Sequence, residues 1–332
     1  MEEIGVLGAG SWGTALSNLI ASKGYKVHLW VREKEVYEGI RESQENKVFL
    51  PGIRLSQNIL PSMDIEEVSK DKDLLLIAIP SHGFRDVLSP ISKNISKHTR
   101  LLVATKGIEN RSLMLMSQVA SSLLGDEIME RYACIAGPSF AKEVVQSLPT
   151  VVTVASNNLT MAKGLQNLLH THWFRVYVTD DVMGAQLAGA LKNVIAIAAG
   201  MCDALGFGHN ARAALITRGL VEITRLGLKL GAQPKTFAGL AGLGDLILTC
   251  TSDLSRNRTF GYKIGLGMSV KEITESTQMV AEGLRTTKSA FELSMMMGIE
   301  MPITEQVYKI LYEGKPPMEA AKEVMTRSLK EE

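Results

Sequence analysis

The sequence predicts an α/β fold in which a doubly wound, mostly parallel sheet is followed by an all-helical C-terminal domain. Up to about residue 180, short continuous apolar runs alternate with stretches of helical periodicity. This alternation is typical of a parallel sheet whose two faces are both covered by helices. Beyond residue 180 the strand signals end, and helical periodicity continues between glycine and proline breaks. We therefore expect two domains in the 332 residues, 1–180 and 181–332.

Seven short apolar runs predict the strands of the first domain. The first run is followed by a helix pattern over residues 12–22, which ends before Gly24, and a second short helix is expected over residues 64–70. The last two runs are expected at the edge of the sheet. In chain order, the predicted strands are residues 4–7, 27–31, 74–79, 101–104, 133–136, 150–155 and 174–178.

The second domain carries several helix-start signals. Ser269 and Glu272 have the spacing of a capping box, which predicts that a helix begins there. Pro234, Pro302 and Pro317 are expected in the first turns of helices, where the missing backbone N–H has no cost. The three methionines at residues 295–297 are interpreted as core filler.

One segment is long and apolar enough to suggest a membrane span. In residues 182–202 the only charged side chain is Lys192, which lies near the middle. A charge at the centre of a lipid-facing helix costs at least about 2.5 kcal/mol. We therefore expect a helix buried in protein and no integral membrane segment, with a membrane-anchored protein as the alternative.

Composition limits the function classes further. Lys and Arg number 36 and Asp and Glu number 35, so the net charge is +1. This balance argues against a nucleic-acid partner bound through a generally basic surface. Cys134, Cys202 and Cys250 are far apart, and they form neither a disulfide framework nor a zinc-ligand spacing. The cysteine pattern therefore favours a reducing compartment and predicts no metal site, and the chain start does not show the pattern of a secretory signal.

Gly8, Gly10 and Gly13 form a GxGxxG motif between the first predicted strand and the first predicted helix. In this position the motif is typical of the Rossmann-type dinucleotide-binding turn. Gly8 permits the tight turn, Gly10 lets the pyrophosphate approach the backbone, and Gly13 allows close helix–strand packing. The start of the helix then offers free N–H groups to phosphate. Residues 1–180 are therefore predicted to bind a dinucleotide.

The residues after the second predicted strand bear on the choice of cofactor. An NAD site usually has Asp or Glu at the end of this strand, where it bonds the ribose hydroxyls. Here the strand is followed by Arg32 and Glu33. Arg32 can pair with the 2′-phosphate of NADP(H), whereas Glu33 can serve the ribose of NAD(H). NADP(H) is favoured and NAD(H) stays open, as does Arg32 as an ordinary surface cation.

Candidate residues also follow two of the later strands. Ligands of open α/β sheets bind beyond the carboxyl ends of the strands. Lys106 follows one predicted strand, and Gly137 and Ser139 follow the next one. Lys106 is thus placed to meet an anion or a carbonyl group, with an ordinary surface lysine as the alternative.

Lys192, followed by Asn193, is enclosed by apolar neighbours in the sequence. Burial lowers the pKa of a lysine, because it disfavours the charged form. Lys192 is therefore a candidate general acid for a carbonyl that is being reduced, and a base for the reverse step. A lysine that snorkels to the surface is the alternative. Asp245, in a second glycine-rich apolar segment, is expected to orient Lys192 or keep it charged, unless it only caps a helix.

Ser255, Arg256 and Asn257 form a dense set of hydrogen-bond donors. Arginine makes bidentate contacts to phosphate, so this run predicts the recognition of a phosphorylated small molecule. A polar loop that caps a helix is the alternative.

Several long segments match the motifs of one family. They are GAGSWGTAL from Gly8, NKVFLPG from Asn46, ATKGIE from Ala104, AGPSFAKEV from Ala136, LKNVIAIAAG from Leu191, AGLGDLILTCTSDLSRNRTFG from Ala241 and VAEGLRTTKSA from Val280. With these segments the chain resembles the bacterial-type NAD(P)-dependent glycerol-3-phosphate dehydrogenases along essentially its whole length. The resemblance implies a Rossmann domain, a helical substrate-binding domain, a homodimer and a cytoplasmic location.

The resemblance also implies a reaction, the interconversion of dihydroxyacetone phosphate and sn-glycerol 3-phosphate with NADP(H) or NAD(H), which supplies phospholipid synthesis. Lys192 matches the proton donor and acceptor, and Lys106 matches a lysine that touches cofactor and substrate. Lys106 and Asn193 are expected to hold or polarise the C2 oxygen. Other residues matching cofactor contacts are Ser11, Trp12, Arg32, Ala141, Arg256, Val280 and Glu282, and those matching substrate contacts are Gly137, Ser139, Asp245, Ser255, Arg256 and Asn257.

Two alternative functions stay open from the sequence. One is a dehydrogenase of the same architecture whose substrate carries a carboxylate in place of the phosphate. Activity measured on a panel of substrates would distinguish it from a glycerol-3-phosphate dehydrogenase. The other is a non-enzymatic redox sensor that binds NADP and regulates a partner. Such a sensor would bind cofactor without turning over any substrate.

The cofactor hypothesis predicts the behaviour of Arg32→Ala. If Arg32 pairs with the 2′-phosphate, the variant loses about 1.5–3 kcal/mol of NADPH binding, the value of a hydrogen bond to a charged group. Its KM for NADPH then rises at least tenfold, whereas its KM for NADH stays unchanged. Steady-state kinetics with both cofactors measure this, and an unchanged KM for NADPH would remove Arg32 from the site.

Overall fold

The computed structural model describes residues 2–276 and 282–328. It divides the chain into two compact units. Unit 1 comprises Met1–Lys106 and Met116–Ala185, and unit 2 comprises Gly107–Leu115 and Gln186–Glu332. Unit 2 thus includes a short segment from the first half of the chain, which periodicity does not reveal. The assignment of residues 1–180 to cofactor binding and residues 181–332 to substrate binding stays a prediction.

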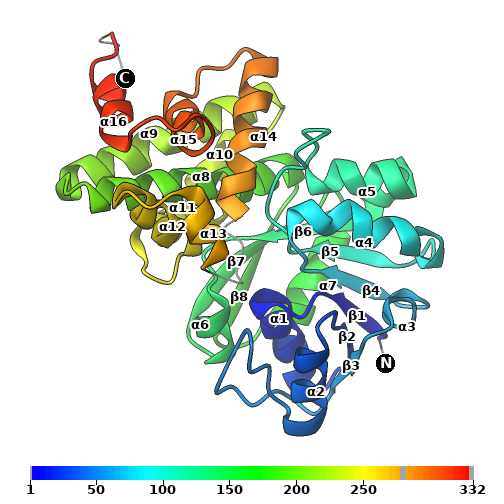
Figure 1. Ribbon diagram of the computed structural model, residues 1–332. Helices are drawn as coiled ribbons and strands as arrows, with labels where there is room; N and C mark the ends of the chain where they lie inside the picture. The colour runs from blue at the N-terminus through cyan, green and yellow to red at the C-terminus, as the bar shows by residue number, and fades with distance from the viewer. Residues whose placement is uncertain (1, 277–281, 329–332) are drawn as a thin grey trace. The chain divides into compact units, whose positions relative to one another are not determined.

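The described part of unit 1 holds an eight-stranded sheet with the order β3-β2-β1-β4-β5-β6-β7-β8 (Figure 1). Neighbouring strands are parallel, except that β6 and β7 are antiparallel. The predicted mostly parallel sheet is therefore confirmed. The strands are β1 Ile4–Leu7, β2 Val27–Trp30, β3 Ile59–Ser62, β4 Leu74–Ile77, β5 Arg100–Val103, β6 Tyr132–Ala136, β7 Thr150–Ala155 and β8 Phe174–Thr179.

The helices of unit 1 cover both faces of this sheet. The chain runs from β1 to β3 in one direction and from β4 to β6 in the other. Right-handed crossovers therefore place α1 and α2 on one face and α3, α4 and α5 on the other. Helix α1 packs against α6 and α7, which share its face (Figure 1). The helices are α1 Ser11–Ser22, α2 Lys34–Ser43, α3 Ile65–Ser69, α4 Phe84–Ile91, α5 Met116–Leu124, α6 Ala141–Val145 and α7 Leu159–Leu169.

Strand β3 has no counterpart among the predicted strands. Its four residues include Pro61, and the preceding Leu60 is exposed. Proline removes a donor from the ladder, and the run lacks the continuous apolar character of the central strands. The structure explains both features, because β3 is the edge strand and pairs only with β2.

The described part of unit 2 is helical, apart from an isolated bridge between Ile108 and Leu115. The predicted capping box at Ser269 and Glu272 is confirmed at the start of α13. The three prolines open α10, α15 and α16, as predicted. The helices after β8 are α8 Val182–Ala204, α9 Gly208–Lys229, α10 Pro234–Ala238, α11 Asp245–Thr251, α12 Arg256–Gly265, α13 Val270–Glu275, α14 Glu282–Met297, α15 Pro302–Glu313 and α16 Pro317–Met325 (Figure 1).

The interpretation of the methionine run as core filler is wrong for two of its members. Met295 is 68% exposed and Met296 is 63% exposed near the end of α14. Side chains that are adjacent in a helix point about 100° apart, so an unbroken apolar run cannot all face one core.

Helix α8 is the one described helix that is long and apolar enough to cross a membrane, with a mean hydropathy of 1.4. Its most apolar stretch is 94% buried inside the protein, as expected for a core helix. The backbones of α8 and α12 approach each other closely, and this explains the glycines at their contact. A Cβ atom on Gly200 would lie 2.0 Å from the carbonyl oxygen of Arg258, and one on Gly261 would lie 2.0 Å from that of Ile197.

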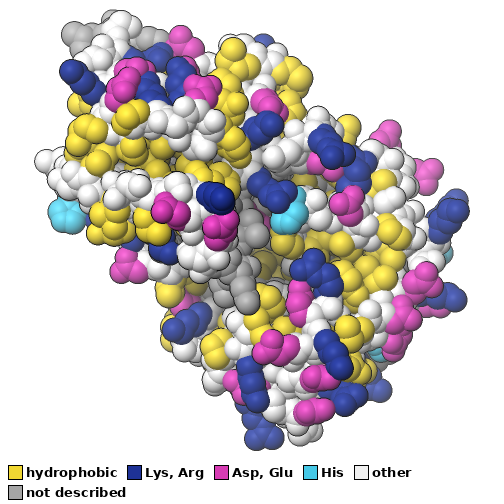
Figure 2. All heavy atoms as spheres, in the orientation of Figure 1, with side chains coloured by type: hydrophobic (Ala, Val, Ile, Leu, Met, Phe, Trp, Pro, Cys, Tyr) yellow, Lys and Arg dark blue, Asp and Glu magenta, His cyan; other side chains and the backbone are white. Residues whose placement is uncertain are grey.

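Charged side chains of both signs are intermixed on the face drawn in Figure 2. Dark blue Lys and Arg alternate with magenta Asp and Glu over that face, and no extended region of one sign is seen there. This distribution agrees with the net charge of +1.

Glu222 joins two helices of unit 2 through a buried carboxylate. From α9, its two oxygens accept hydrogen bonds from the backbone N–H groups of Ile303 at 2.6 Å and Thr304 at 3.1 Å, in the first turn of α15. The Thr304 hydroxyl also donates to it at 3.1 Å. The side chain thereby satisfies N–H groups that have no partner within α15.

The buried position of Glu222 predicts a pH-dependent contribution to stability. Burial raises the pKa of the Glu222 carboxyl from 4.5 to about 7. Between these values the folded state binds more protons than the unfolded state, so the free energy of unfolding falls as pH rises. In Glu222→Gln this titration is absent. Urea unfolding from pH 4.5 to 7 should show the wild type losing up to about 3 kcal/mol relative to the variant, at about 1.4 kcal/mol per pKa unit. If the two proteins differ by the same free energy of unfolding at every pH in this range, the prediction is contradicted.

Candidate functional site

The predicted dinucleotide turn joins β1 to α1. Gly8 adopts φ +110°, and a Cβ atom there would lie 2.6 Å from the carbonyl oxygen of Ala78. At Gly13 a Cβ atom would lie 1.9 Å from the carbonyl oxygen of Gly8. Only glycine fits at either position, which agrees with the roles expected for the tight turn and for close helix–strand packing.

Asn46 holds this turn in place, although no role was expected for its side chain. Its Nδ2 donates to the carbonyl oxygen of Ala9 at 2.8 Å and to Thr14 Oγ1 at 2.9 Å. Its Oδ1 accepts from the backbone N–H of Phe49 at 3.1 Å, and the Phe49 carbonyl accepts from Ser11 Oγ at 3.0 Å. Asn46 is fully buried, so these bonds fix the loop shape.

The residues around the start of α1 fit a bound dinucleotide. The N-cap residue, Gly10, has no side-chain hydrogen bond to the helix, and a Cβ atom on it would meet nothing within 4 Å. The start of α1 thus has no side-chain cap, and there is room beside Gly10 for a phosphate to approach it. Trp12 Nε1 is buried and has no hydrogen-bond partner within the described residues, so a donor is available beside them.

Arg32 and Glu33 follow β2 and bond each other. Arg32 donates to Glu33 Oε1 at 2.7 Å, and the two side chains are 78% and 39% exposed. An exposed pair of this kind contributes at most about 1 kcal/mol. The geometry therefore leaves both cofactor hypotheses open.

The ends of β5 and β6 bring three predicted residues to one edge of the sheet. Thr105 donates from Oγ1 to the carbonyl oxygen of Ile79 at 2.8 Å, which ties the end of β5 to the segment after β4. The half-buried Lys106 follows directly. After the neighbouring β6, Ser139 donates to the carbonyl oxygen of Gly137 at 2.9 Å. Ala141 then begins α6.

In unit 2 the structure pairs Lys192 with Asp245. The ammonium group of Lys192 on α8 donates to Asp245 Oδ1 at the first position of α11. It also donates to Thr249 Oγ1 at 2.9 Å, and Thr249 in turn donates to the backbone oxygen of Asp245 at 2.6 Å. The Lys192 and Asp245 side chains are only 9% and 1% exposed. Asp245 is thus a buried ion-pair partner, and Lys192 does not snorkel to the surface.

Asn193 and Asn257 form a second buried cluster in unit 2. Asn257 Nδ2 on α12 donates to Asn193 Oδ1 on α8 at 3.0 Å. The backbone N–H of Gly283 in the first turn of α14 donates to Asn257 Oδ1 at 2.8 Å. Gly283 and Thr249 were not singled out from the sequence, since their roles depend on contacts between helices.

The start of α12 combines a cap with an exposed cation. Ser255 is the N-cap, and its Oγ accepts from the backbone N–H of Arg258 at 3.2 Å. Arg256 follows at the first helical position and is exposed. Arg258 is held by Asp203 at 2.8 Å. The capping interpretation of this run is correct for Ser255, and phosphate recognition by the run stays a prediction.

Two further predicted cofactor residues lie around residue 280. Glu282 is half-buried and begins α14. Val280 lies outside the described residues. Among the residues that the structure does describe, no group of three or more His, Cys, Asp or Glu side chains is placed to hold a metal ion.

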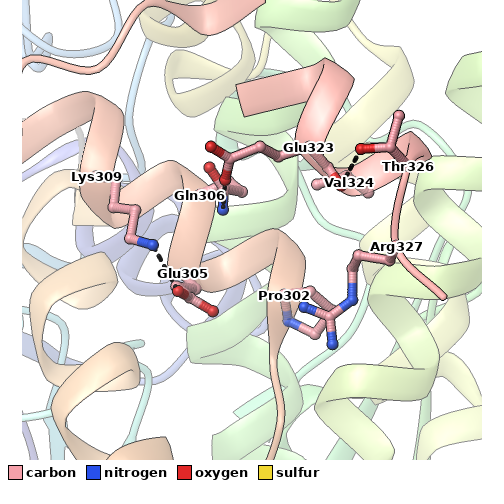
Figure 3. Close-up of a pocket in the computed structure, with 8 residues that line it drawn as sticks. All are labelled: Pro302, Glu305, Gln306, Lys309, Glu323, Val324, Thr326 and Arg327. Carbon is pink, nitrogen blue, oxygen red and sulfur yellow. Dashed lines mark hydrogen bonds and ion pairs between the residues drawn. The ribbon is translucent and has the colours of Figure 1, made fainter. Parts of the chain in front are cut away.

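A cavity of about 210 Å³ between α15 and α16 contains none of the predicted site residues. Figure 3 shows its polar lining, in which Lys309 bonds Glu305 at 2.7 Å. Opposite charges of this lining neutralise each other, so we assign no ligand to it.

Two family models cover the chain. The model of the NAD-dependent glycerol-3-phosphate dehydrogenase N-terminus matches residues 3–162, and that of the C-terminus matches residues 181–322. The chain belongs to the NAD-dependent glycerol-3-phosphate dehydrogenase family. Membership confirms the predicted enzyme class, an NAD(P)-dependent oxidoreductase, and the family expected from the sequence motifs.

Individual relatives agree over the full length. A glycerol-3-phosphate dehydrogenase (NAD(P)+) from Geobacter sulfurreducens is 51% identical over 331 residues, which cover 100% of this chain and 99% of the relative. One from Syntrophobacter fumaroxidans is 50% identical, with coverage of 99% and 97%. The solved glycerol-3-phosphate dehydrogenase of Coxiella burnetii is 41% identical, with a TM-score of 0.94 and coverage of 98% and 99%.

Proposed function

We propose that this chain interconverts dihydroxyacetone phosphate and sn-glycerol 3-phosphate, with Lys192 exchanging the proton at the C2 oxygen. The observation that carries the assignment of Lys192 is its buried ion pair with Asp245. A buried charge is tolerated only when it is paired and hydrogen-bonded, and functional sites are where such groups gather. Family membership supports the reaction itself.

The partners of Lys192 suit proton exchange. The Asp245 carboxylate stabilises the ammonium form, which is the form that donates a proton during carbonyl reduction. Thr249 accepts one Lys192 N–H at 2.9 Å and anchors itself to the backbone of Asp245. These two contacts hold the ammonium group at a fixed place between α8 and α11, where it can exchange a proton with a substrate oxygen. In the oxidation direction, the neutral amine takes the proton from the C2 hydroxyl.

The remaining unit 2 residues hold the substrate. Arg256 binds the phosphate through its exposed guanidinium, together with the donors of Ser255 and Asn257. Asn193 donates to the C2 oxygen. Binding energy from the phosphate positions the reacting carbonyl, so it contributes to turnover as well as to affinity.

Unit 1 holds the cofactor. The dinucleotide is held by the glycines of the turn, by Ser11 and Trp12 at the start of α1, and by Ala141. Arg32 favours NADP(H), and NAD(H) is also accepted. Glu282, Val280 and Arg256 add further cofactor contacts. Lys106 contacts both ligands, and Gly137 and Ser139 contact the substrate. When bound, the nicotinamide supplies the hydride to substrate C2 or accepts it from there.

The biological setting follows from the reaction. The product, sn-glycerol 3-phosphate, supplies phospholipid synthesis. We further propose that the chain works as a homodimer in the cytoplasm. The three buried free cysteines agree with a reducing compartment.

The role of the phosphate predicts strong discrimination between two substrates. With NADPH, dihydroxyacetone phosphate should have a kcat/KM at least about 1,000-fold above that of dihydroxyacetone, since several charge-assisted hydrogen bonds of about 1.5–3 kcal/mol each are lost without the phosphate. Initial rates of NADPH oxidation over a range of both substrates measure this. Equal values would contradict the phosphate-binding role of Ser255, Arg256 and Asn257.

A further inference from the structure

Two buried asparagines and one backbone N–H form a chain of hydrogen bonds with a fixed direction. The N–H of Gly283 donates to Asn257 Oδ1 at 2.8 Å. Since a backbone N–H can only donate, the side-chain atom that faces it must be the amide oxygen. The other end of the Asn257 amide, Nδ2, therefore faces Asn193 at 3.0 Å, and the atom that receives it must be Asn193 Oδ1. A single N–H group thus determines the orientation of both amides.

Burial means that each amide must satisfy its hydrogen bonds inside the protein, and this favours one orientation. Asn193 is 4% exposed and Asn257 is 9% exposed. A Cβ atom on Gly283 would lie 2.7 Å from Asn257 Oδ1 and 2.8 Å from the backbone oxygen of Asn193, so α14 approaches both residues as closely as glycine allows. A reversed Asn257 amide would set N–H against N–H at Gly283, which leaves buried donors unsatisfied at about 1–3 kcal/mol each.

We propose that Gly283 and Asn257 act as positioning residues, which turn the amide nitrogen of Asn193 toward the C2 oxygen of the substrate. This inference rests on the function proposed above. With Oδ1 of Asn193 occupied by Asn257, the group that remains for the substrate is Nδ2, a donor. Negative charge develops on the C2 oxygen as the carbonyl is reduced. A preoriented donor stabilises this charge, whereas a carbonyl oxygen in the same place would repel it.

Two substitutions at Asn257 separate positioning from simple packing. Asn257→Asp keeps the shape and still accepts from Gly283, but the new carboxylate can only accept. Asn193 must then turn its Nδ2 to the carboxylate and present Oδ1 to the substrate. Asn257→Ala leaves Asn193 free to present either end. Single-turnover reduction at saturating dihydroxyacetone phosphate should therefore be about 100-fold slower than wild type in Asn257→Asp. The rate of Asn257→Ala should fall by a smaller factor.

A merely structural role predicts the opposite order. Asn257→Ala removes the acceptor of Gly283 and leaves a cavity, so it should be the less stable variant in thermal unfolding. Asn158 provides a matched control, because its side chain caps α7 through Met161 N at 3.0 Å in unit 1. Asn158→Asp and Asn158→Ala should show the same stability order and no change in the rate of the chemical step.

A third substitution tests whether the effect passes through Asn193. In an Asn193→Leu background, Asn257→Asp and Asn257→Ala should reduce unphosphorylated dihydroxyacetone at the same rate, because the amide to be oriented is gone and this substrate has no phosphate that contacts residue 257. A persistent difference would mean that the carboxylate acts on the substrate directly. The inference is overturned by that result, or by Asn257→Ala reacting as slowly as Asn257→Asp. Failure of the wild type to reduce dihydroxyacetone phosphate would instead overturn the proposed function and this inference with it.

Discussion

The ion pair between Lys192 and Asp245 is the constraint on which the arrangement of unit 2 depends. Helix α8 is apolar along most of its length and must be buried, so it takes the Lys192 ammonium into the protein interior. Removing one partner of a buried pair costs about 3–5 kcal/mol, because the other charge is left uncompensated. Helix α11 therefore has to begin where Asp245 reaches Lys192. Thr249, one turn later, completes the hydrogen bonds of both residues.

The same arrangement explains why polar side chains cluster along one stretch of α8. Glycines at the α8–α12 contact bring the two backbones together, and this approach places Asn257 against Asn193. Arg258, one residue further, is held by Asp203 at the end of α8. Helix α12 is thus fixed at its start, where Ser255 and Arg256 lie. Buried polar networks with every member satisfied specify one geometry, which a site for a small substrate requires.

Elements whose local pattern and final environment agree could be predicted from the sequence. Strands β1, β2, β7 and β8 lie within a residue or so of the predicted ranges. Each of them contains a run of apolar or β-branched residues that is at least partly buried. Strand β3 could not be predicted, because an edge strand with Pro61 has no such run. The placement of residues 107–115 in unit 2 depends on contacts such as that of Ser289 with Asn110, which periodicity does not show.

The candidate site divides in the same way. Lys192 and Asp245 could be singled out because a charge in an apolar segment is unusual in itself. Asn46, Thr249 and Gly283 could not, because an asparagine, a threonine and a glycine are ordinary in loops and helices. Each of them matters because of a partner that is distant in the sequence and close in the fold. Thr249, for example, lies 57 residues after Lys192 and accepts a hydrogen bond from it. The orientation of the Asn257 and Asn193 amides likewise cannot be predicted from the sequence, because it depends on which groups they bond.

The most direct test of the account is single-turnover reduction of dihydroxyacetone phosphate by Lys192→Ala at saturating NADPH, with cofactor affinity measured on the same sample. Loss of a positioned general acid should lower the rate of the chemical step by about 100- to 10,000-fold, while NADPH binds as tightly as in the wild type. Partial recovery on addition of a small primary amine would agree with this. A rate close to that of the wild type would contradict the assignment of proton transfer to Lys192.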